Sequence, residues 1–314
     1  MTPPPAWFSA ALDAAVHEGT TVVDGASIAY RMWGDPAGRS IVLVHGGAAH
    51  SRWWDHIAPL LTNGSASSGG DDPPVPTRGW RVVAVDLSGH GDSDRRDRYS
   101  LDTWAREVLA VVTEAGTAAA SVVIGHSMGG LVTLRLATLA GSQIAGAVAI
   151  DSPVRDMAPE DRAARQHRAF GPLRVYPTPE AAVARFRPIP DQPTLAYIAD
   201  HVAATSIRPA EGGWTWKFDP RVFARDHLTP ELLTRLDCRV ALFRAEHGLV
   251  TPQQGEVLYD RLGRVAPVIE IPAAGHHVML DQHIALVAAL RTLVSDWVHS
   301  LPGTPPGPGG GPGA

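Results

Sequence analysis

The amino-acid sequence predicts an α/β fold, in which a mostly parallel sheet is covered by helices on both faces. Short β-branched runs alternate with longer stretches in which apolar residues recur at helical spacing. Runs such as 41–44 and 144–150 are apolar throughout, as expected of strands buried on both faces. With 314 residues, 45% of them hydrophobic and 19% charged, the chain can bury a substantial core.

The predicted sheet begins with an antiparallel pair and continues in parallel. Residues 20–23 and 27–33 flank Asp24-Gly25, a dipeptide typical of a tight hairpin turn. The other strands are predicted at 41–44, 81–85, 121–124, 144–150, 238–243 and 265–271. Helices are predicted over 51–61, from Ser100 to Gly116, over 128–140, after Thr251, and in the last stretch, where Val287, Leu290, Val294 and Trp297 share one side.

Composition divides the chain into a core and two unusual segments. Residues 62–79 are polar and rich in Gly, Ser and Pro, which predicts a surface loop insertion. Residues 152–230 are rich in Pro, Arg and aromatic residues without a clear core strand, which predicts a mainly helical cap, or lid, after the sixth strand. Residues 1–151 and 231–301 then form one discontinuous core domain. The tail 302–314 has the composition of a disordered linker.

Several classes of protein fit the composition poorly. The formal net charge is −5 and no basic stripe is interleaved with aromatic residues, so we expect no nucleic-acid partner. The single cysteine, Cys238, excludes an internal disulfide and a Cys-based zinc cluster and is expected to be a small buried residue. No leader and no apolar run of ~18 residues is present, so we expect a cytoplasmic protein without membrane contact.

Residues 125–129 carry the motif G-x-S-x-G, here Gly-His-Ser-Met-Gly. A predicted strand enters the motif and a predicted helix leaves it, so the serine must lie on a tight turn that admits only small neighbours. Such a turn lifts Ser127 above the sheet, where helix amides near Met128 can stabilise a developing negative oxygen. A bare match could be accidental among 31 glycines, but the strand and helix around it favour a nucleophile.

Four motifs in this order resemble the α/β-hydrolase family, and the resemblance covers nearly all of residues 20 to 300. They are the turn His45-Gly46-Gly47, the turn DLSGHGDS at 86–93, the serine turn GHSMGG at 125–130 and Ala274-Gly275-His276. The resemblance implies an α/β-hydrolase fold with an eight-stranded, mostly parallel sheet. The sequence has neither H-E-x-x-H nor a complete dinucleotide fingerprint, so we expect no metal and no cofactor.

The resemblance also assigns roles to individual positions. It implies that the amides of Gly47 and Met128 form the oxyanion hole, with Ala48 as the alternative to Gly47. A serine hydroxyl needs a base to accept its proton, and His276 stands where the family carries that histidine. We expect His277 beside it to pack or to form hydrogen bonds.

The acid that orients the histidine is less certain from the sequence. The family usually carries an aspartate in the loop after strand 238–243, but Gly248 occupies that position. Asp151 lies at the end of the strand after the nucleophile helix, an acid site used by some relatives, and it is the preferred candidate. Glu246 lies two residues before Gly248 and is the alternative acid.

A serine nucleophile suits acyl transfer through a tetrahedral oxyanion. The sequence therefore predicts a serine hydrolase that cleaves an ester, lactone or thioester bond through an acyl-enzyme intermediate. Alternatives are a carbon–carbon bond hydrolase, an accessory thioesterase, or a non-catalytic ligand-binding protein with the same scaffold. The Trp53-Trp54 pair and the group 214–218 are expected to pack in the core or lid. If the group 214–218 lines a pocket, we expect an apolar acyl substrate. We expect the protein to be a monomer or a homodimer.

Overall fold

A computed structural model describes residues 3–62, 79–114, 121–154, 173–233 and 236–299. Most of the predicted loop insertion 62–79 and the tail 302–314 lie outside the described residues. No helix within these ranges is long and apolar enough to cross a membrane.

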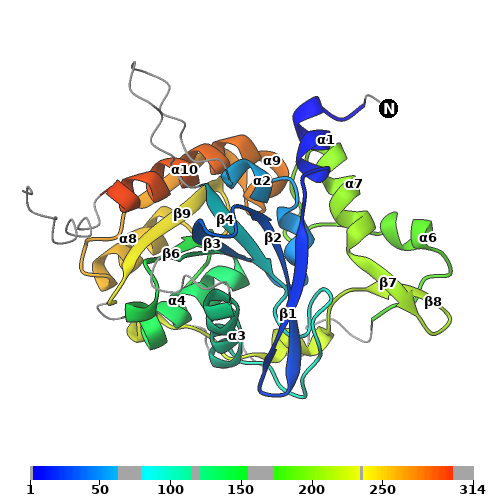
Figure 1. The fold of residues 1–314 in the computed structure, drawn as a ribbon, viewed down its shortest axis with the longest axis horizontal. Helices are drawn as coiled ribbons and strands as arrows, with labels where there is room; N and C mark the ends of the chain where they lie inside the picture. The colour runs from blue at the N-terminus through cyan, green and yellow to red at the C-terminus, as the bar shows by residue number, and fades with distance from the viewer. Residues whose placement is uncertain (1–2, 63–78, 115–120, 155–172, 234–235, 300–314) are drawn as a thin grey trace, which may run out of the picture.

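The core is one eight-stranded sheet, which confirms the predicted fold class (Figure 1). Its spatial order is β1-β2-β4-β3-β5-β6-β9-β10, and β2 runs antiparallel to both of its neighbours while the remaining pairs are parallel. Asp24 and Gly25 form the predicted hairpin turn with φ of 46° and 78°. The strands are β1 His17–Val23, β2 Ala26–Gly34, β3 Arg39–Val44, β4 Trp80–Val85, β5 Val122–His126, β6 Gly146–Ile150, β9 Arg239–His247 and β10 Val268–Gly275.

Helices cover both faces of the sheet, and alternate strand residues point into two separate cores (Figure 1). Val42 and Val44 of β3 join the core under α3 Leu101–Glu114, α4 Met128–Ala140 and α8 Pro252–Arg261. Ile41 and Leu43 join the opposite core, which is closed by α1 Ala6–Leu12, α2 Ala58–Leu61, α9 Val278–Asp281 and α10 His283–His299. The central strands β3, β5 and β6 are therefore buried on both faces, as expected of unbroken apolar runs.

The helix predicted over 51–61 is interrupted in the structure. A 3₁₀ turn, η1 Ser51–Trp54, precedes the short helix α2, whose second residue is Pro59. Proline has no amide hydrogen and its ring clashes with the carbonyl four residues earlier, so it is tolerated only in the first turn of a helix. The prediction of one continuous helix was wrong because it passed over this proline.

The segment between β6 and β9 contains more β-structure than a mainly helical cap would have. Besides α6 Pro179–Val183 and α7 Ala196–Thr205 it forms a two-stranded antiparallel sheet of β7 Ile207–Ala210 and β8 Gly213–Trp216. The turn uses Gly212 and Gly213 at φ of 78° and 149°, a region that favours glycine. Two 3₁₀ turns, η4 Pro220–Ala224 and η5 Pro230–Leu232, lead back to the sheet. Residues 155–172 lie outside the description.

Cys238 lies just before β9 and is half-buried against the α3 and α4 side of the core. Burial raises the pKa of its thiol to about 11, so the side chain is an inert packing residue at neutral pH.

Candidate active site

Ser127 lies on a strained turn between β5 and α4. Its φ of 54° and ψ of −117° are unfavourable for a residue with a side chain, and its amide donates to the Ile150 carbonyl at 2.9 Å. The turn is so tight that a Cβ at Gly125 would lie 2.1 Å from the Gly129 carbonyl oxygen. A Cβ at Gly129 would lie 2.4 Å from the carbonyl oxygens of Val44 and His45. Both glycines of the motif are therefore required by the backbone packing.

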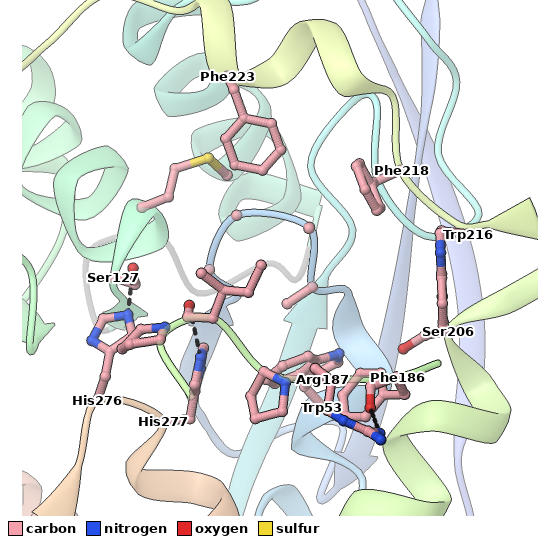
Figure 2. A pocket seen from close by; sticks show the side chains of 18 of the residues that line it. Trp53, Ser127, Phe186, Arg187, Ser206, Trp216, Phe218, Phe223, His276 and His277 are labelled. Carbon is pink, nitrogen blue, oxygen red and sulfur yellow. Dashed lines mark hydrogen bonds between the residues drawn. The ribbon is translucent and has the colours of Figure 1, made fainter. Parts of the chain in front are cut away.

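Three side chains from distant parts of the chain form one line of hydrogen bonds. The Ser127 Oγ lies 3.0 Å from the His276 Nε2, and the His276 Nδ1 lies 2.7 Å from the Asp151 Oδ2. Figure 2 shows Ser127 directly beside the His276 ring, with the hydrogen bond between them. Because β5, β6 and β10 are parallel, the turns after their carboxyl ends meet at the same edge of the sheet.

Asp151 is fully buried and is held by several donors. Its Oδ2 accepts the Leu249 amide at 2.7 Å, and its Oδ1 accepts the amides of Ala245 at 3.3 Å and Val250 at 3.2 Å. Burial by itself raises the pKa of this carboxyl, but the hydrogen bonds from His276 and the backbone amides outweigh it and bring the pKa below the ordinary value. The carboxylate is therefore charged at neutral pH.

The two candidate acids are clearly separated in space. Glu246 is exposed, and its carboxylate accepts the Ala273 amide at 2.7 Å. Gly248 lies against the other candidate, since a Cβ built on it would be 2.4 Å from both carboxylate oxygens of Asp151. The structure thus brings Asp151, and not Glu246, to His276.

The turn at 45–48 faces the start of α4. Met128 is the first residue of that helix, so its amide has no intrahelical acceptor and is free to bind an anion. A Cβ at Gly47 would lie 3.1 Å from the Phe223 ring and 3.8 Å from the Met128 sulfur, which places Gly47 beside Met128. Ala48 follows in the same cavity wall with a φ of 58°.

Two buried histidines support this geometry through the backbone. His126 donates from Nε2 to the carbonyl oxygen of His276 at 2.8 Å and so anchors the turn that carries the imidazole. His45 donates from Nδ1 to the Gly46 carbonyl at 2.7 Å and accepts the Leu87 amide at Nε2. Burial lowers the pKa of His45 to about 4 and holds that of His126 well below its ordinary value, so both rings are neutral. The link from His126 to His276 joins parts 150 residues apart and has no local sequence signal.

His277 contacts the segment before α7. Its Nε2 donates to the Ile189 carbonyl at 3.1 Å, and its amide donates to the Gln192 side chain at 2.7 Å. The ring packs against Trp53 with centroids 5.5 Å apart. Burial lowers the pKa of the His277 imidazole to about 3.

Ser127 and His276 open into a cavity of about 740 Å³, within the roughly 300–1,000 Å³ typical of small-molecule sites. Figure 2 shows Ser127 and His276 at one end and Ser206 with Trp216 at the other. Much of the wall is aromatic, with Trp53, Phe186, Trp216, Phe218 and Phe223. Four arginines also line the cavity, Arg174, Arg185, Arg187 and Arg225, and the described lining includes no acidic residue. Trp54, in contrast, is fully buried in the core.

Comparisons with known proteins agree with the observed fold. The model of the family described as alpha/beta hydrolase matches residues 41–290. Esterase Rv0045c of Mycobacterium tuberculosis is 27% identical over 276 residues, which cover 86% of this chain and 87% of that protein. Lipase LipV of the same organism is 27% identical over 267 residues, covering 82% and 94%. The solved thioesterase domain from the curacin biosynthetic pathway shares the fold, with a TM-score of 0.70 at 22% identity over 90% of this chain and 99% of that domain.

Proposed function

The chain belongs to the α/β-hydrolase family and is a hydrolase, and on this basis we propose that it cleaves carboxylic esters with Ser127, His276 and Asp151 as its triad. The observation that carries the proposal is the unbroken line of hydrogen bonds from the serine hydroxyl through the imidazole to a buried carboxylate. Its position at one end of a cavity of small-molecule size supports the same reading.

The proposed reaction begins when the His276 Nε2 accepts the proton of Ser127 and the serine oxygen attacks the ester carbonyl. Asp151 holds the imidazole in the correct tautomer and stabilises the imidazolium. The amides of Gly47 and Met128 stabilise the negative oxygen of the tetrahedral intermediate. His276 then protonates the departing alcohol, which leaves Ser127 acylated. A water molecule, deprotonated by His276, releases the carboxylic acid and restores the serine.

We infer that the substrate is a small acyl compound with a mainly apolar body. The aromatic residues of the cavity wall supply the complementary surface, and the relatives named as an esterase and a lipase act on bonds of this class. The arginines Arg174, Arg185 and Arg187 are exposed at the cavity and favour a substrate that also carries a negative group.

The test measures hydrolysis of short and long p-nitrophenyl esters together with labelling by a fluorophosphonate. The proposal predicts ester turnover and stoichiometric labelling in the wild type, and loss of both in Ser127→Ala. A panel of thioesters, lactones and β-diketones made at matched acyl length identifies the preferred bond. Folded protein that neither turns over any ester nor reacts with the fluorophosphonate would instead be a ligand-binding relative, and the proposal would be rejected.

A further inference from the structure

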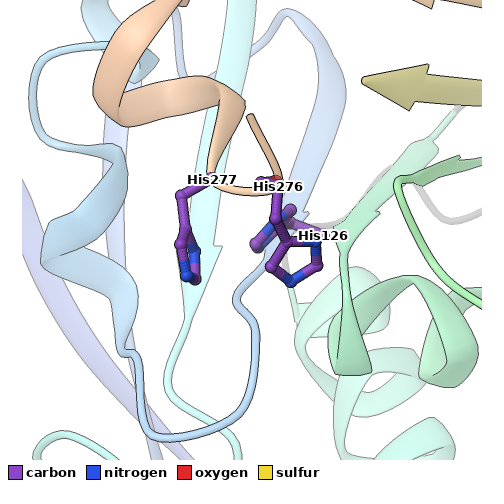
Figure 3. A group of neighbouring side chains, drawn as sticks. All are labelled: His126, His276 and His277. Atoms are coloured by element: carbon purple, nitrogen blue, oxygen red, sulfur yellow. The ribbon is translucent and has the colours of Figure 1, made fainter. Parts of the chain in front are cut away.

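The turn that carries His276 is held from two sides. On one side His126 donates from Nε2 to the His276 carbonyl at 2.8 Å, and Figure 3 shows the two rings beside each other. On the other side the turn meets Gln192, which lies in the segment before α7. We propose that Gln192 is a positioning residue, which holds the two neighbours of His276 and thereby keeps the imidazole in reach of Ser127. The inference rests on the proposed role of His276 as the base.

The side-chain amide of Gln192 makes three hydrogen bonds at this turn. Its Oε1 accepts the His277 amide at 2.7 Å. Its Nε2 donates to the His277 carbonyl at 3.3 Å and to the Asp281 Oδ2 at 3.0 Å. The neighbours therefore present one donor and two acceptors, a pattern that a glutamine side chain satisfies and a carboxylate or an apolar side chain of similar size does not.

Asp281 extends the same contact to the residue before His276. Its Oδ2 also accepts the Gly275 amide at 2.6 Å. The Gln192 amide itself packs against this residue, since a Cβ at Gly275 would lie 2.7 Å from the Cδ and Nε2 of Gln192. Gly275 and His277 are thus both held by the pair of Gln192 and Asp281. The imidazole between them is fixed by the kind of supporting hydrogen bonds that precise reaction geometry requires.

Gln192 acts through the turn and not through the substrate, because it is not among the described residues that line the cavity. Its own segment is tied to the same region at two more points. The Ile189 carbonyl accepts the His277 Nε2 at 3.1 Å, and the Leu195 amide donates to the Leu280 carbonyl at 2.9 Å. Loss of the Gln192 amide should therefore impair the chemical step and leave substrate binding nearly unchanged.

The first test is Gln192→Met, which keeps a side chain of similar size but removes all three hydrogen bonds. A displacement of about 1 Å at a reacting group can cost about 100-fold in rate, so we expect kcat on p-nitrophenyl esters to fall by about 10- to 100-fold. KM should stay within about 3-fold of the wild type, and the rate of fluorophosphonate labelling of Ser127 should fall with kcat. Gln282→Met is the matched control, since this half-buried glutamine donates to the Ala273 carbonyl at 3.4 Å, outside the turn, and its loss should change kcat by less than about 3-fold.

The second readout follows the imidazole without catalysis. The proton that the His276 Nδ1 donates to Asp151 is expected to give a separate, far-downfield resonance in the proton NMR spectrum. This resonance should shift or broaden in Gln192→Met and stay unchanged in Gln282→Met. A purely structural role of Gln192 would instead lower the thermal stability and leave the resonance and kcat of the folded protein unchanged.

Gln192→Glu gives an independent test, and it serves also if the methionine variant does not fold. The introduced carboxylate keeps an acceptor for the His277 amide but places its second oxygen where the Nε2 lies, 3.0 Å from the Asp281 carboxylate. Two carboxylates this close cannot both be ionised, and burial already raises the pKa of Asp281. Of the other titratable groups here, His277 is kept neutral by burial, which lowers its pKa to about 3, and His247 in its charged form acts against the rise at Asp281.

When the introduced carboxyl is protonated it can donate again, as the glutamine does. The kcat of Gln192→Glu relative to that of the wild type should therefore rise as the pH falls from about 8 to about 6. A folded Gln192→Met variant with wild-type kcat and an unchanged His276 resonance would overturn the inference, as would a Gln192→Glu ratio that does not depend on pH. A resonance that responds to Gln192 in a protein without esterase activity would support the positioning role and reject the proposed function.

Discussion

Replacing Asp151 by asparagine is the most informative single change in this protein. The substitution keeps the shape of the side chain but removes its charge and turns one of its two acceptors into a donor. In the wild type, Asp151 accepts four hydrogen bonds, one from His276 and three from the amides of Ala245, Leu249 and Val250. No neighbour in this set offers an acceptor for the new amide hydrogens, so asparagine cannot fit without loss.

The two possible orientations of the asparagine damage the site in different ways. When the asparagine NH₂ occupies the Oδ2 position, it faces the Leu249 amide, which is also a donor. His276 must then accept a hydrogen bond at Nδ1, so its ring proton moves to Nε2 and this nitrogen can no longer act as the base. With its NH₂ at the Oδ1 position, it opposes the amides of Ala245 and Val250, and the imidazolium has no countercharge. By analogy with other triads, we expect kcat to fall by about 10³- to 10⁴-fold, or roughly 4–5.5 kcal/mol of barrier.

The assay is kcat on the best p-nitrophenyl ester, with thermal unfolding as a check that the variant remains folded. Glu246→Gln is the matched control, because it removes a carboxylate from the same region, and this exposed group bonds only the Ala273 amide in the described structure. We expect Glu246→Gln to change kcat by less than about 3-fold, in line with a surface polar contact. A folded Asp151→Asn variant with near wild-type turnover, or a larger loss in Glu246→Gln, would refute the assignment.

Three further predictions address the space, the charge and the pH response around the site. Gly248→Ala should lower kcat by at least about 10-fold, because its Cβ would lie 2.4 Å from the carboxylate oxygens that hold His276; unchanged kinetics would show that this contact is relieved without moving the acid. Arg187→Glu should lower the ratio of kcat/KM for a dicarboxylic monoester to kcat/KM for a neutral ester by about 2- to 5-fold, as expected of an exposed charge. Arg264→Glu lies outside the cavity lining and should leave this ratio unchanged. Burial lowers the pKa of His56 to about 4, so the unfolded chain binds more protons between that value and about 6.5 and stability falls as pH decreases through this window. In urea unfolding, the free energy of unfolding of His56→Gln should therefore depend less steeply on pH than that of the wild type, by about 1.4 kcal/mol per pH unit within this window. An unchanged slope would show that His56 is not a buried neutral group.

The sheet could be predicted from the sequence because its signal is local. The central strands β3, β5 and β6 contain unbroken apolar runs, and the first two strands flank the Asp24-Gly25 turn signal. The predicted ranges differ from the observed ones by a few residues at the ends. The largest differences are in the last two strands: β10 was predicted over 265–271 and forms Val268–Gly275. β9 was predicted to end at Phe243 and continues to His247. Its last residues are polar, but they pair with β10 through backbone hydrogen bonds, which do not depend on the apolar pattern.

The elements that the sequence did not predict depend on contacts between distant segments. The helix α1 has only seven residues, too few to be stable alone, and it forms because Phe8 and Ala11 are buried against the rest of the chain. The sheet of β7 and β8 is likewise short, and Tyr176 pairs with Trp214 at its edge. Short elements of this kind carry little propensity of their own, so tertiary packing decides them.

The site separates into a local and a non-local part in the same way. Ser127 and His276 are indicated by turns whose glycines are recognisable in the sequence, and the structure places the two side chains 3.0 Å apart. The choice between Asp151 and Glu246 could not be made locally, because it depends on how the loops after β6 and β9 pack. The sequence did contain one indication, the glycine at position 248. The structure shows that a side chain at this position would collide with the Asp151 carboxylate.

The pairing of β6 with β9 explains why the acid can come from either strand. Ile150 pairs with Phe243 and the Asp151 amide donates to the Phe243 carbonyl at 2.7 Å, so the residues that follow both strands enter the same space beside His276. A side chain at 248 would occupy the volume that the Asp151 carboxylate fills. The Asp151 carboxylate therefore fits in this position only because residue 248 is a glycine. The proposed triad needs a carboxylate at the His276 Nδ1, and either of the two neighbouring parallel strands β6 and β9 could place one there.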